Sequence, residues 1–156
     1  MEVPRIEDLQ SPELLVRLQT GGALVAAGDS SWDALLAALQ HADSQVRWRA
    51  VVALGWLGDA RAVEPLRKLL HGTPYEIKIN AAWALGQIND TRAADSLLDL
   101  FRTEATQDPD AAYNAALALL RLGIVEPLLH DLDSPQADAF RVATAALASR
   151  PYVEEI

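Results

Sequence analysis

The chain has 156 residues, of which 51% are apolar, so it can bury a continuous core as one domain and is not a disordered chain. It contains no cysteine, which excludes disulfides and thiolate metal sites. Its net charge is −9, with Arg and Lys scattered along the chain, which argues against nucleic acid and anionic membranes as ligands. Proteins remain as partners, particularly those with a basic patch.

The start of the chain does not read as a targeting segment. Residues 1–8 are acidic and lack the apolar stretch of a secretory signal. No apolar run in the sequence approaches the ~20 residues that span a bilayer. The sequence therefore predicts a soluble, cytoplasmic protein.

Apolar residues recur at helical spacing and divide the chain into helical hairpins within a single domain, 1–156. A helix from Glu13 to Ala27, weakened by Gly21-Gly22, is followed by a helix from Trp32 to Leu39, and together they form the first hairpin. The predicted segments are an N-terminal extension 1–11, a degenerate first hairpin 12–41, hairpins 44–71, 75–102 and 109–132, a terminal half-repeat 135–149 and a tail 150–156.

The two central hairpins repeat with a period of 31 residues, because residues 46–62 align with residues 77–93. In the first of them, Gly58-Asp59 ends one helix and leads into a second, from about Val63 to His71. A fixed period of this length indicates stacked repeats rather than one closed core.

Polar residues that recur with the repeat are predicted to be structural. Asp59 with Arg61, and Asp90 with Arg92, are predicted to cap helices and to form a charge ladder between repeats. Residues at one shared position of the first helices are predicted to hydrogen-bond to the backbone: Arg49, Asn80, Asn114 and Arg141.

The repeat carries a motif made of Val46-Arg47, Ala50, Ala53-Leu54-Gly55, Leu57-Gly58-Asp59, Arg61-Ala62-Val63, Pro65-Leu66 and Leu69-Leu70. This motif resembles the HEAT-like repeats of the phycobilisome lyase family. The resemblance implies an all-α, right-handed solenoid of about four and a half HEAT-like hairpins, whose second helices line the concave face. For function, we expect a non-catalytic scaffold or adaptor that binds a protein. The resemblance implies an alternative, a bilin lyase or chaperone or a phycobilisome assembly or degradation factor acting on phycobiliproteins.

An acidic residue occupies the same position in the second helix of each hairpin, and we call this set the acidic column: Asp33, Glu64, Asp95 and Glu126. Its predicted neighbours at helical spacing include Arg67, His71, Leu98, Arg102 and Leu129. On a concave face, these residues would bind the arginines or lysines of a partner protein. The alternative is structural, because carboxylates in the first turn of a helix offset the helix dipole.

The position of each of the four tryptophans within the repeat predicts whether it is buried or exposed. Trp32, Trp48 and Trp83 align with positions that are apolar in other repeats, which predicts that they belong to the core. Trp56 aligns with Gln87 and Arg121, which predicts an exposed side chain. Exposed tryptophans are frequent interface anchors, although scattered surface aromatics are also ordinary.

No catalytic, cofactor-binding or metal-binding residue is predicted. The histidines lie in separate repeats without a carboxylate at metal-ligand spacing, and phosphate-binding and nucleophile motifs are missing. A bilin would be bound only under the lyase alternative, with Arg67 and Arg102 as candidates for its propionates. The terminal half-repeat lacks a second helix, so its edge would bind a partner or a second copy of the chain through Phe140, Val142, Ala145 and Ala146. The alternative is that Tyr152-Val153 folds back over this edge.

Overall fold

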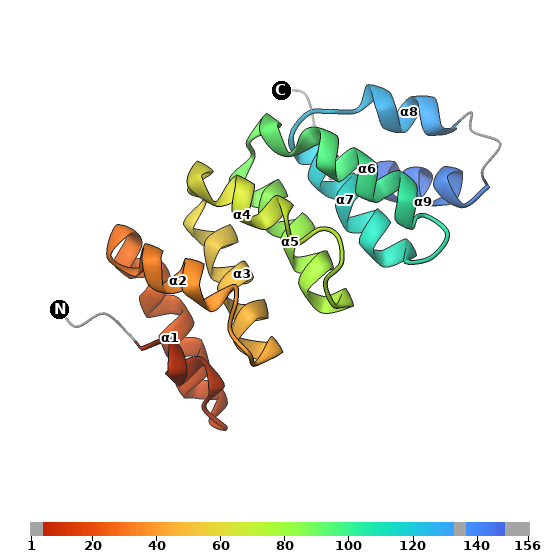
Figure 1. Ribbon diagram of the computed structural model, residues 1–156. Coiled ribbons are helices and arrows are strands. Elements are labelled where there is room, and N and C mark those ends of the chain that lie inside the picture. The colour runs from red at the N-terminus through yellow and green to blue at the C-terminus, as the bar shows by residue number, and fades with distance from the viewer. Residues whose placement is uncertain (1–4, 133–136, 149–156) are drawn as a thin grey trace.

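The computed structural model describes residues 5–132 and 137–148, and the regular elements in these ranges are helices (Figure 1). The first helices of the hairpins are α1 (Leu14–Ala27), α3 (Ser44–Leu57), α5 (Tyr75–Ile88), α7 (Pro109–Arg121) and α9 (Ala137–Ala148). The second helices are α2 (Trp32–Ala38), α4 (Val63–Arg67), α6 (Ala94–Glu104) and α8 (Glu126–Leu132). Short 3-10 helices are η1 (Ile6–Gln10), η2 (Gly28–Ser31), η3 (Ala60–Ala62) and η4 (Thr91–Ala93). The chain is an all-α, right-handed α-solenoid, as the sequence predicts.

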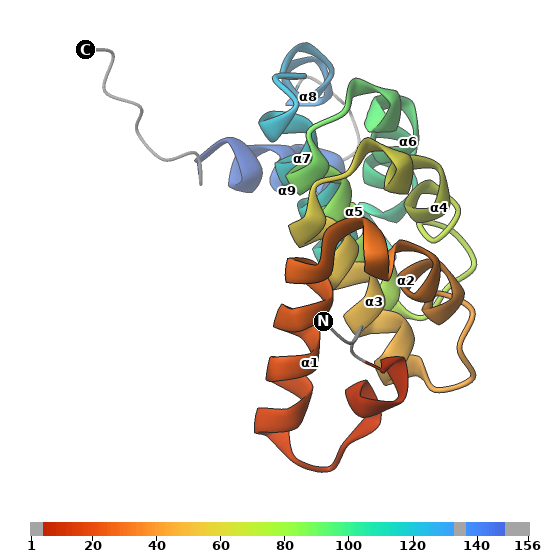
Figure 2. The ribbon, with the colours of Figure 1, turned by 90° about the vertical axis from the view of Figure 1, so that its left-hand side faces the viewer.

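The helices form two layers, which we call the first-helix layer and the second-helix layer; Figure 2 shows α1 on one side and α2, α4 and α6 on the other. Neighbouring first helices pack directly against one another, whereas each second helix mainly contacts the first helix that follows it. Because neighbours lie closer in the first-helix layer, that layer occupies the inner, shorter arc of the stack. The prediction that the second helices line the concave face is therefore wrong.

Residues that are buried in the hydrophobic core between the layers recur at the 31-residue period. Each second helix buries one leucine completely at the same position: Leu35, Leu66, Leu97 and Leu128. The first helices contribute Leu54, Leu85 and Leu119, which are also completely buried. Each repeat therefore completes its core only against its neighbours, as expected for a solenoid.

Glycines let consecutive first helices approach closely. A Cβ atom on Gly55 would lie 2.7 Å from Cζ3 of Trp83 and 2.9 Å from Cβ of Ala84, so only glycine fits there. Gly86 has the same role, since its Cβ would lie 2.9 Å from Cα of Ala118. The equivalent residue of α1, counted from the start of each helix, is Val25. Its side chain prevents the same close approach, and α1 and α3 pack less closely than α3 and α5.

The turns between paired helices use the predicted caps. Gly58 ends α3 in the left-handed conformation, and the carboxylate of Asp59 then accepts a hydrogen bond from the backbone N–H of Arg61 at 2.8 Å. Asp90 accepts the equivalent bond from Arg92 at 2.9 Å. The ladder between repeats is also confirmed, because Arg61 forms an ion pair with Asp29 of the preceding repeat. The capping predictions are thus confirmed at both aspartates. The charge ladder is confirmed for Arg61 but not for Arg92, which donates instead to the carbonyl of Ala60 in the preceding repeat at 3.0 Å.

These contacts predict a pH dependence of stability. Hydrogen bonds from Arg61 and Arg92 lower the pKa values of the Asp59 and Asp90 carboxyls in the folded protein. Groups with a lowered folded pKa stabilise the protein above the unfolded pKa of ~3.9, and this stabilisation is lost as pH falls through the folded value. We expect a variant with Asp59→Asn and Asp90→Asn to have a lower urea midpoint than the wild type at neutral pH. The difference should shrink below about pH 4, and a constant difference would contradict this assignment.

The structure also differs from the sequence prediction in the length of one second helix. The helix predicted from Val63 to His71 ends at Arg67, and the N–H groups of Leu69 and Leu70 then donate to carbonyls three residues earlier, which tightens the last turn. Within the predicted N-terminal extension, η1 packs on α1 and α3 and buries Leu9 at 1% exposure.

Another difference from the sequence prediction lies in the terminal half-repeat. Its helix α9 packs against α7 and α8. Val142 and Ala146 are consequently buried rather than presented at a free edge, which corrects the prediction for these two residues. Ala145 is exposed, and the side chain of Phe140 and the tail 150–156 lie outside the described residues. Self-association through this half-repeat stays a prediction.

Candidate protein-binding groove

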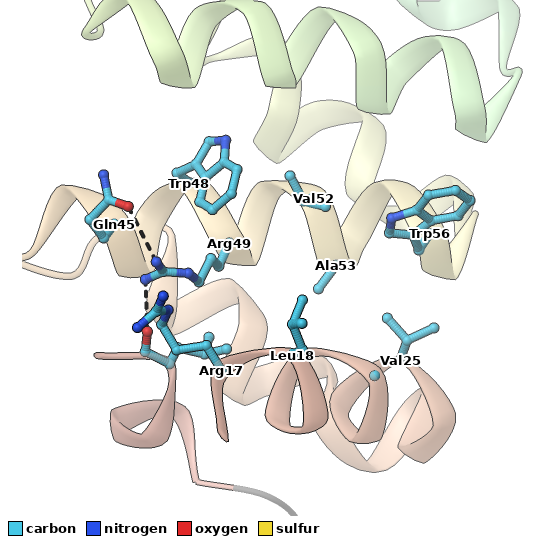
Figure 3. A pocket seen from close by; sticks show the side chains of 12 residues that line it. Arg17, Leu18, Val25, Gln45, Trp48, Arg49, Val52, Ala53 and Trp56 are labelled. Atoms are coloured by element: carbon cyan, nitrogen blue, oxygen red, sulfur yellow. Dashed lines mark hydrogen bonds between the residues drawn. The ribbon is translucent and has the colours of Figure 1, made fainter. Parts of the chain in front are cut away.

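A hollow of about 630 Å³ lies between α1 and α3 on the first-helix layer, and we call it the α1–α3 groove (Figure 3). Residues of η1, α1 and α3 line it: Leu9, Arg17, Leu18, Gly21, Gly22, Val25, Gln45, Trp48, Arg49, Val52, Ala53 and Trp56. The two helices run in the same direction along the groove, so Arg17, Gln45 and Arg49 lie at one end, with Val25 and Trp56 at the other.

The groove is open because α1 departs from the repeat at the residues that face α3. Val25 replaces the glycine that brings α3 and α5 together. Gly21 and Gly22 lie where α3 has Val51 and Val52, and a Cβ atom on either glycine would meet nothing within 4 Å. The wide spacing and the missing side chains together leave the space of the groove open.

The floor and one end of the groove expose apolar side chains. Leu18 is 63% exposed and Trp56 is 64% exposed, while Trp48 is half-buried. The rings of Trp56 and Trp83 pack in a T-shaped arrangement with a centroid distance of 5.3 Å, which fixes the orientation of Trp56 without covering it. Contiguous exposed apolar surface of this kind typically marks an interaction site.

The other end of the groove is basic. Arg17 donates from Nη1 to the carbonyls of Ser11 at 2.6 Å and Pro12 at 2.9 Å. Arg49 donates from Nη1 to the carbonyl of Leu9 at 2.7 Å and from Nη2 to Oε1 of Gln45 at 3.3 Å. The bond to the Leu9 carbonyl confirms the backbone role predicted for Arg49. Within the described residues, no carboxylate lies within salt-bridge distance of either guanidinium.

The electrostatics of this basic end follow from that arrangement. Partial burial lowers the pKa of Arg49, and the positive charge of Arg17 lowers it further, while Asp43 opposes them. The guanidinium of Arg49 also lies 5.3 Å from the ring centroid of Trp48, within cation–π range. Two like charges therefore lie close together beside an aromatic wall, an arrangement that favours a bound anion.

A smaller hollow of about 340 Å³ continues the surface between α3 and α5. Its lining residues are Gln45, Trp48, Tyr75, Glu76, Ile79 and Asn80. Trp48 separates the two hollows, and Tyr75 at the far side donates from its hydroxyl to Asp110 at 2.8 Å. The first-helix layer thus presents an extended apolar surface across three consecutive repeats.

The tryptophan predictions are confirmed in part. Trp56 is exposed as predicted, and Trp32 and Trp83 pack partly buried against the core. The core assignment of Trp48 is wrong, because this side chain is half-buried and lines both hollows. Its counterpart Ile79 is also only half-buried, so the position is apolar in each repeat without being covered by a neighbour.

The acidic column lies on the second-helix layer, and neither hollow includes any of its members. Asp33, Glu64 and Asp95 lie in the first turns of α2, α4 and α6, Glu126 begins α8, and all four are exposed. Part of the column is already paired, since Glu64 accepts a hydrogen bond from Arg67 at 2.7 Å. First-turn positions also give each carboxylate the structural role of offsetting a helix dipole.

The neighbours predicted to share this site have mixed surroundings. Arg67 also donates to the hydroxyl of Ser96 at 2.8 Å, and His71 lies 3.4 Å from Asp99, so both join consecutive repeats. Leu98 packs partly buried on the core, whereas Leu129 is 42% exposed. Arg102 is exposed near the end of α6. Trp56 belongs to the opposite layer, so the predicted site residues do not form one surface.

Protein binding by the acidic column stays a prediction with a direct test. We expect Glu64→Lys combined with Asp95→Lys to weaken binding of a basic partner at low salt and to matter less at high salt, because salt screens exposed charges. Binding constants measured at both ionic strengths check this. Equal affinities for wild type and variant at low salt would exclude the column as a contact surface.

The architecture defines a right-handed α-solenoid built from helical hairpins that bury their core between neighbours. The sequence profile of the HEAT repeats matches residues 4–77 and 33–120, so the chain belongs to the HEAT-repeat family. A search of curated proteins finds no match. Among the described elements, none has the length and apolar character of a bilayer-spanning helix.

Solved structures agree with this assignment. The chain is similar to the complex of CpcE and CpcF of phycocyanin lyase from Nostoc sp. PCC7120, with 26% identity and a TM-score of 0.60. That match covers 91% of this chain but 62% of the other, so the chain spans less than two thirds of the lyase chain. It is also similar to an engineered protein, with 25% identity, a TM-score of 0.51 and coverage of 92% and 76%. A designed armadillo repeat protein, with 21% identity, a TM-score of 0.53 and coverage of 94% and 81%, shows the fold alone.

Proposed function

We propose that the protein is a non-catalytic scaffold that binds a partner protein on its first-helix layer, with the α1–α3 groove as the main contact surface. The observation that supports this most is a hollow of about 630 Å³ lined by the exposed side chains of Leu18 and Trp56 and the half-buried ring of Trp48. Burial of such side chains in a central pocket dominates the energy of many protein interfaces. A rigid repeat stack holds the groove open without the partner, which lowers the entropic cost of binding.

The groove can be filled without disturbing the fold, which gives a sharp test. Gly22→Leu places a side chain in open space on α1, and leucine is also the better helix former. We expect the tagged variant to lose the proteins that wild type retains from an extract of its source cells, as measured by quantitative mass spectrometry.

A matched control separates occupation of the groove from a general effect of an added leucine. Ala23→Leu lies on the same helix at an exposed position that does not line the groove. This control should retain the partner. Retention of the same partner by Gly22→Leu would contradict the proposed function.

A second candidate function is favoured by the likeness to the phycocyanin lyase complex. In this alternative, the protein acts on phycobiliproteins as a bilin lyase or chaperone, or in phycobilisome assembly or degradation. The α1–α3 groove offers aromatic rings beside Arg17 and Arg49, whose hydrogen-bond partners are all neutral groups. This arrangement suits a conjugated ligand with carboxylates better than Arg67, whose charge is already paired with Glu64. Proximity and orientation would then supply the rate enhancement.

Absorbance distinguishes the two candidates. If the protein binds a bilin, mixing them should red-shift and sharpen the visible band of the bilin, and Arg49→Gln should reduce that change. An unchanged spectrum at saturating protein would reject the bilin alternative and leave the scaffold proposal intact.

A further inference from the structure

We infer that the occupant of the α1–α3 groove is an amphipathic α-helix of the partner protein, with an apolar stripe along the groove and a carboxylate at one end that meets Arg17 and Arg49. The inference rests on the proposed function and adds the chemistry of the partner. It is carried by the groove's dimensions, the lack of free backbone groups in its walls, and the charge at one end.

The length of the groove suits a short stretch of helix. On α1 it extends from Arg17 to Val25, and on α3 from Gln45 to Trp56. At a rise of about 1.5 Å per residue, these spans are roughly 12 and 16 Å, or two to three helical turns. Apolar residues at i, i+4 and i+7 of a partner helix would therefore all fit between the basic end and Trp56.

The walls of the groove favour a helix over an extended peptide. An extended segment must satisfy its backbone N–H and C=O groups through its binding site. Here the walls are α1 and α3, whose own backbone hydrogen bonds are used within the helices, and the polar side chains lie at one end only. A helix satisfies its backbone internally and presents mostly side chains, as the apolar wall requires.

The charge of the groove is opposite to that of the chain as a whole. The protein has a net charge of −9, yet the two charged residues that line the groove are both arginines. Each guanidinium has five N–H donors, and the bonds from Arg17 described above use Nη1 alone. A carboxylate from the partner would accept the remaining donors and relieve the repulsion between the two arginines.

Fluorescein-labelled synthetic peptides provide the test, by anisotropy titration against the full chain at low and moderate salt. One peptide carries leucines at i, i+4 and i+7 with a pair of glutamates at one end, and is made with the glutamates at either terminus. A second has lysines in place of the glutamates, and a third has serines in place of the leucines.

One orientation of the glutamate peptide should bind about tenfold or more tightly than the lysine peptide at low salt, and the serine peptide should not bind. Gly22→Leu should abolish binding, Ala23→Leu should preserve it, and Arg49→Gln should remove the preference for glutamate. Thermal melting of each variant confirms that it is folded.

Failure of both glutamate peptides to bind, or equal binding of the lysine peptide, would overturn the inference. Concentration-dependent light scattering of the protein alone, reduced by Gly22→Leu, would instead identify a second copy of the chain as the occupant and also overturn it. If peptides fail while Gly22→Leu still abolishes capture of the cellular partner, the proposed function stands and only the helical occupant is wrong.

Discussion

Replacing Gly55 with alanine should destabilise the protein strongly. The new Cβ atom would lie 2.7 Å from Cζ3 of Trp83 and 2.9 Å from Cβ of Ala84, and the backbone Cα of Ala84 is only 3.0 Å away. Part of this contact is with the backbone and with a Cβ fixed to it, so α3 and α5 must separate. Overpacking of a close core contact costs about 1–3 kcal/mol, occasionally more. Urea unfolding monitored by circular dichroism measures the loss.

A glycine-to-alanine substitution elsewhere in the first-helix layer should increase the stability of the protein. Gly22→Ala adds a Cβ atom in open space within α1, where alanine is the better helix former by about 0.8–1 kcal/mol. The pair therefore distinguishes a packing constraint from a general effect of removing glycine. Similar unfolding free energies for the two variants would show that Gly55 does not set the distance between α3 and α5.

A second large effect is expected from Lys78→Met. The ammonium of Lys78 lies 2.8 Å from Oε1 of Glu104 and 3.7 Å from Oδ2 of Asp108, and the side chains of all three residues are 14–18% exposed. Asp108 also caps α7 by accepting a hydrogen bond from the N–H of Ala111. Removing the cation leaves two mostly buried carboxylates without a counterion, and loss of one partner of such a group costs about 3 kcal/mol.

Two further variants check the cause of that loss. Lys68→Met makes the same change at an exposed site on the second-helix layer and should leave the urea midpoint nearly unchanged. Glu104→Gln added to Lys78→Met should recover part of the stability, because it removes one of the two unpaired charges. A double variant no more stable than Lys78→Met would contradict the ion-pair explanation.

The fold could be predicted from the sequence because the recurring residues show which positions of each repeat pack against its neighbours. The same residues recur at 31-residue spacing where they face neighbouring repeats, and the buried leucines Leu35, Leu66 and Leu97 follow that spacing. The caps at Asp59 and Asp90 depend on local sequence and were therefore also predictable. The layer that forms the inner side of the solenoid could not be predicted, because it depends on how closely whole helices approach one another.

The groove could not be found from the repeat, because it results from a departure from the repeat. In the sequence, Gly21-Gly22 only weaken the helical pattern of α1. The open space beside them, which forms part of the groove, is evident only from the structure. The usable signal was the replacement of glycine by Val25 at the position where α3 and α5 have Gly55 and Gly86. A column of acids is easier to recognise in a sequence than a missing side chain.

Site-specific photo-crosslinking tests most directly whether the partner lies in the α1–α3 groove. A benzoylphenylalanine at position 52 would lie in the groove in place of Val52, whereas one at position 107 would replace the exposed Gln107 between α6 and α7. After illumination in the source cells, we predict a crosslinked partner from position 52 and none from position 107. A partner crosslinked only from position 107 would contradict the assignment of the groove as the binding surface.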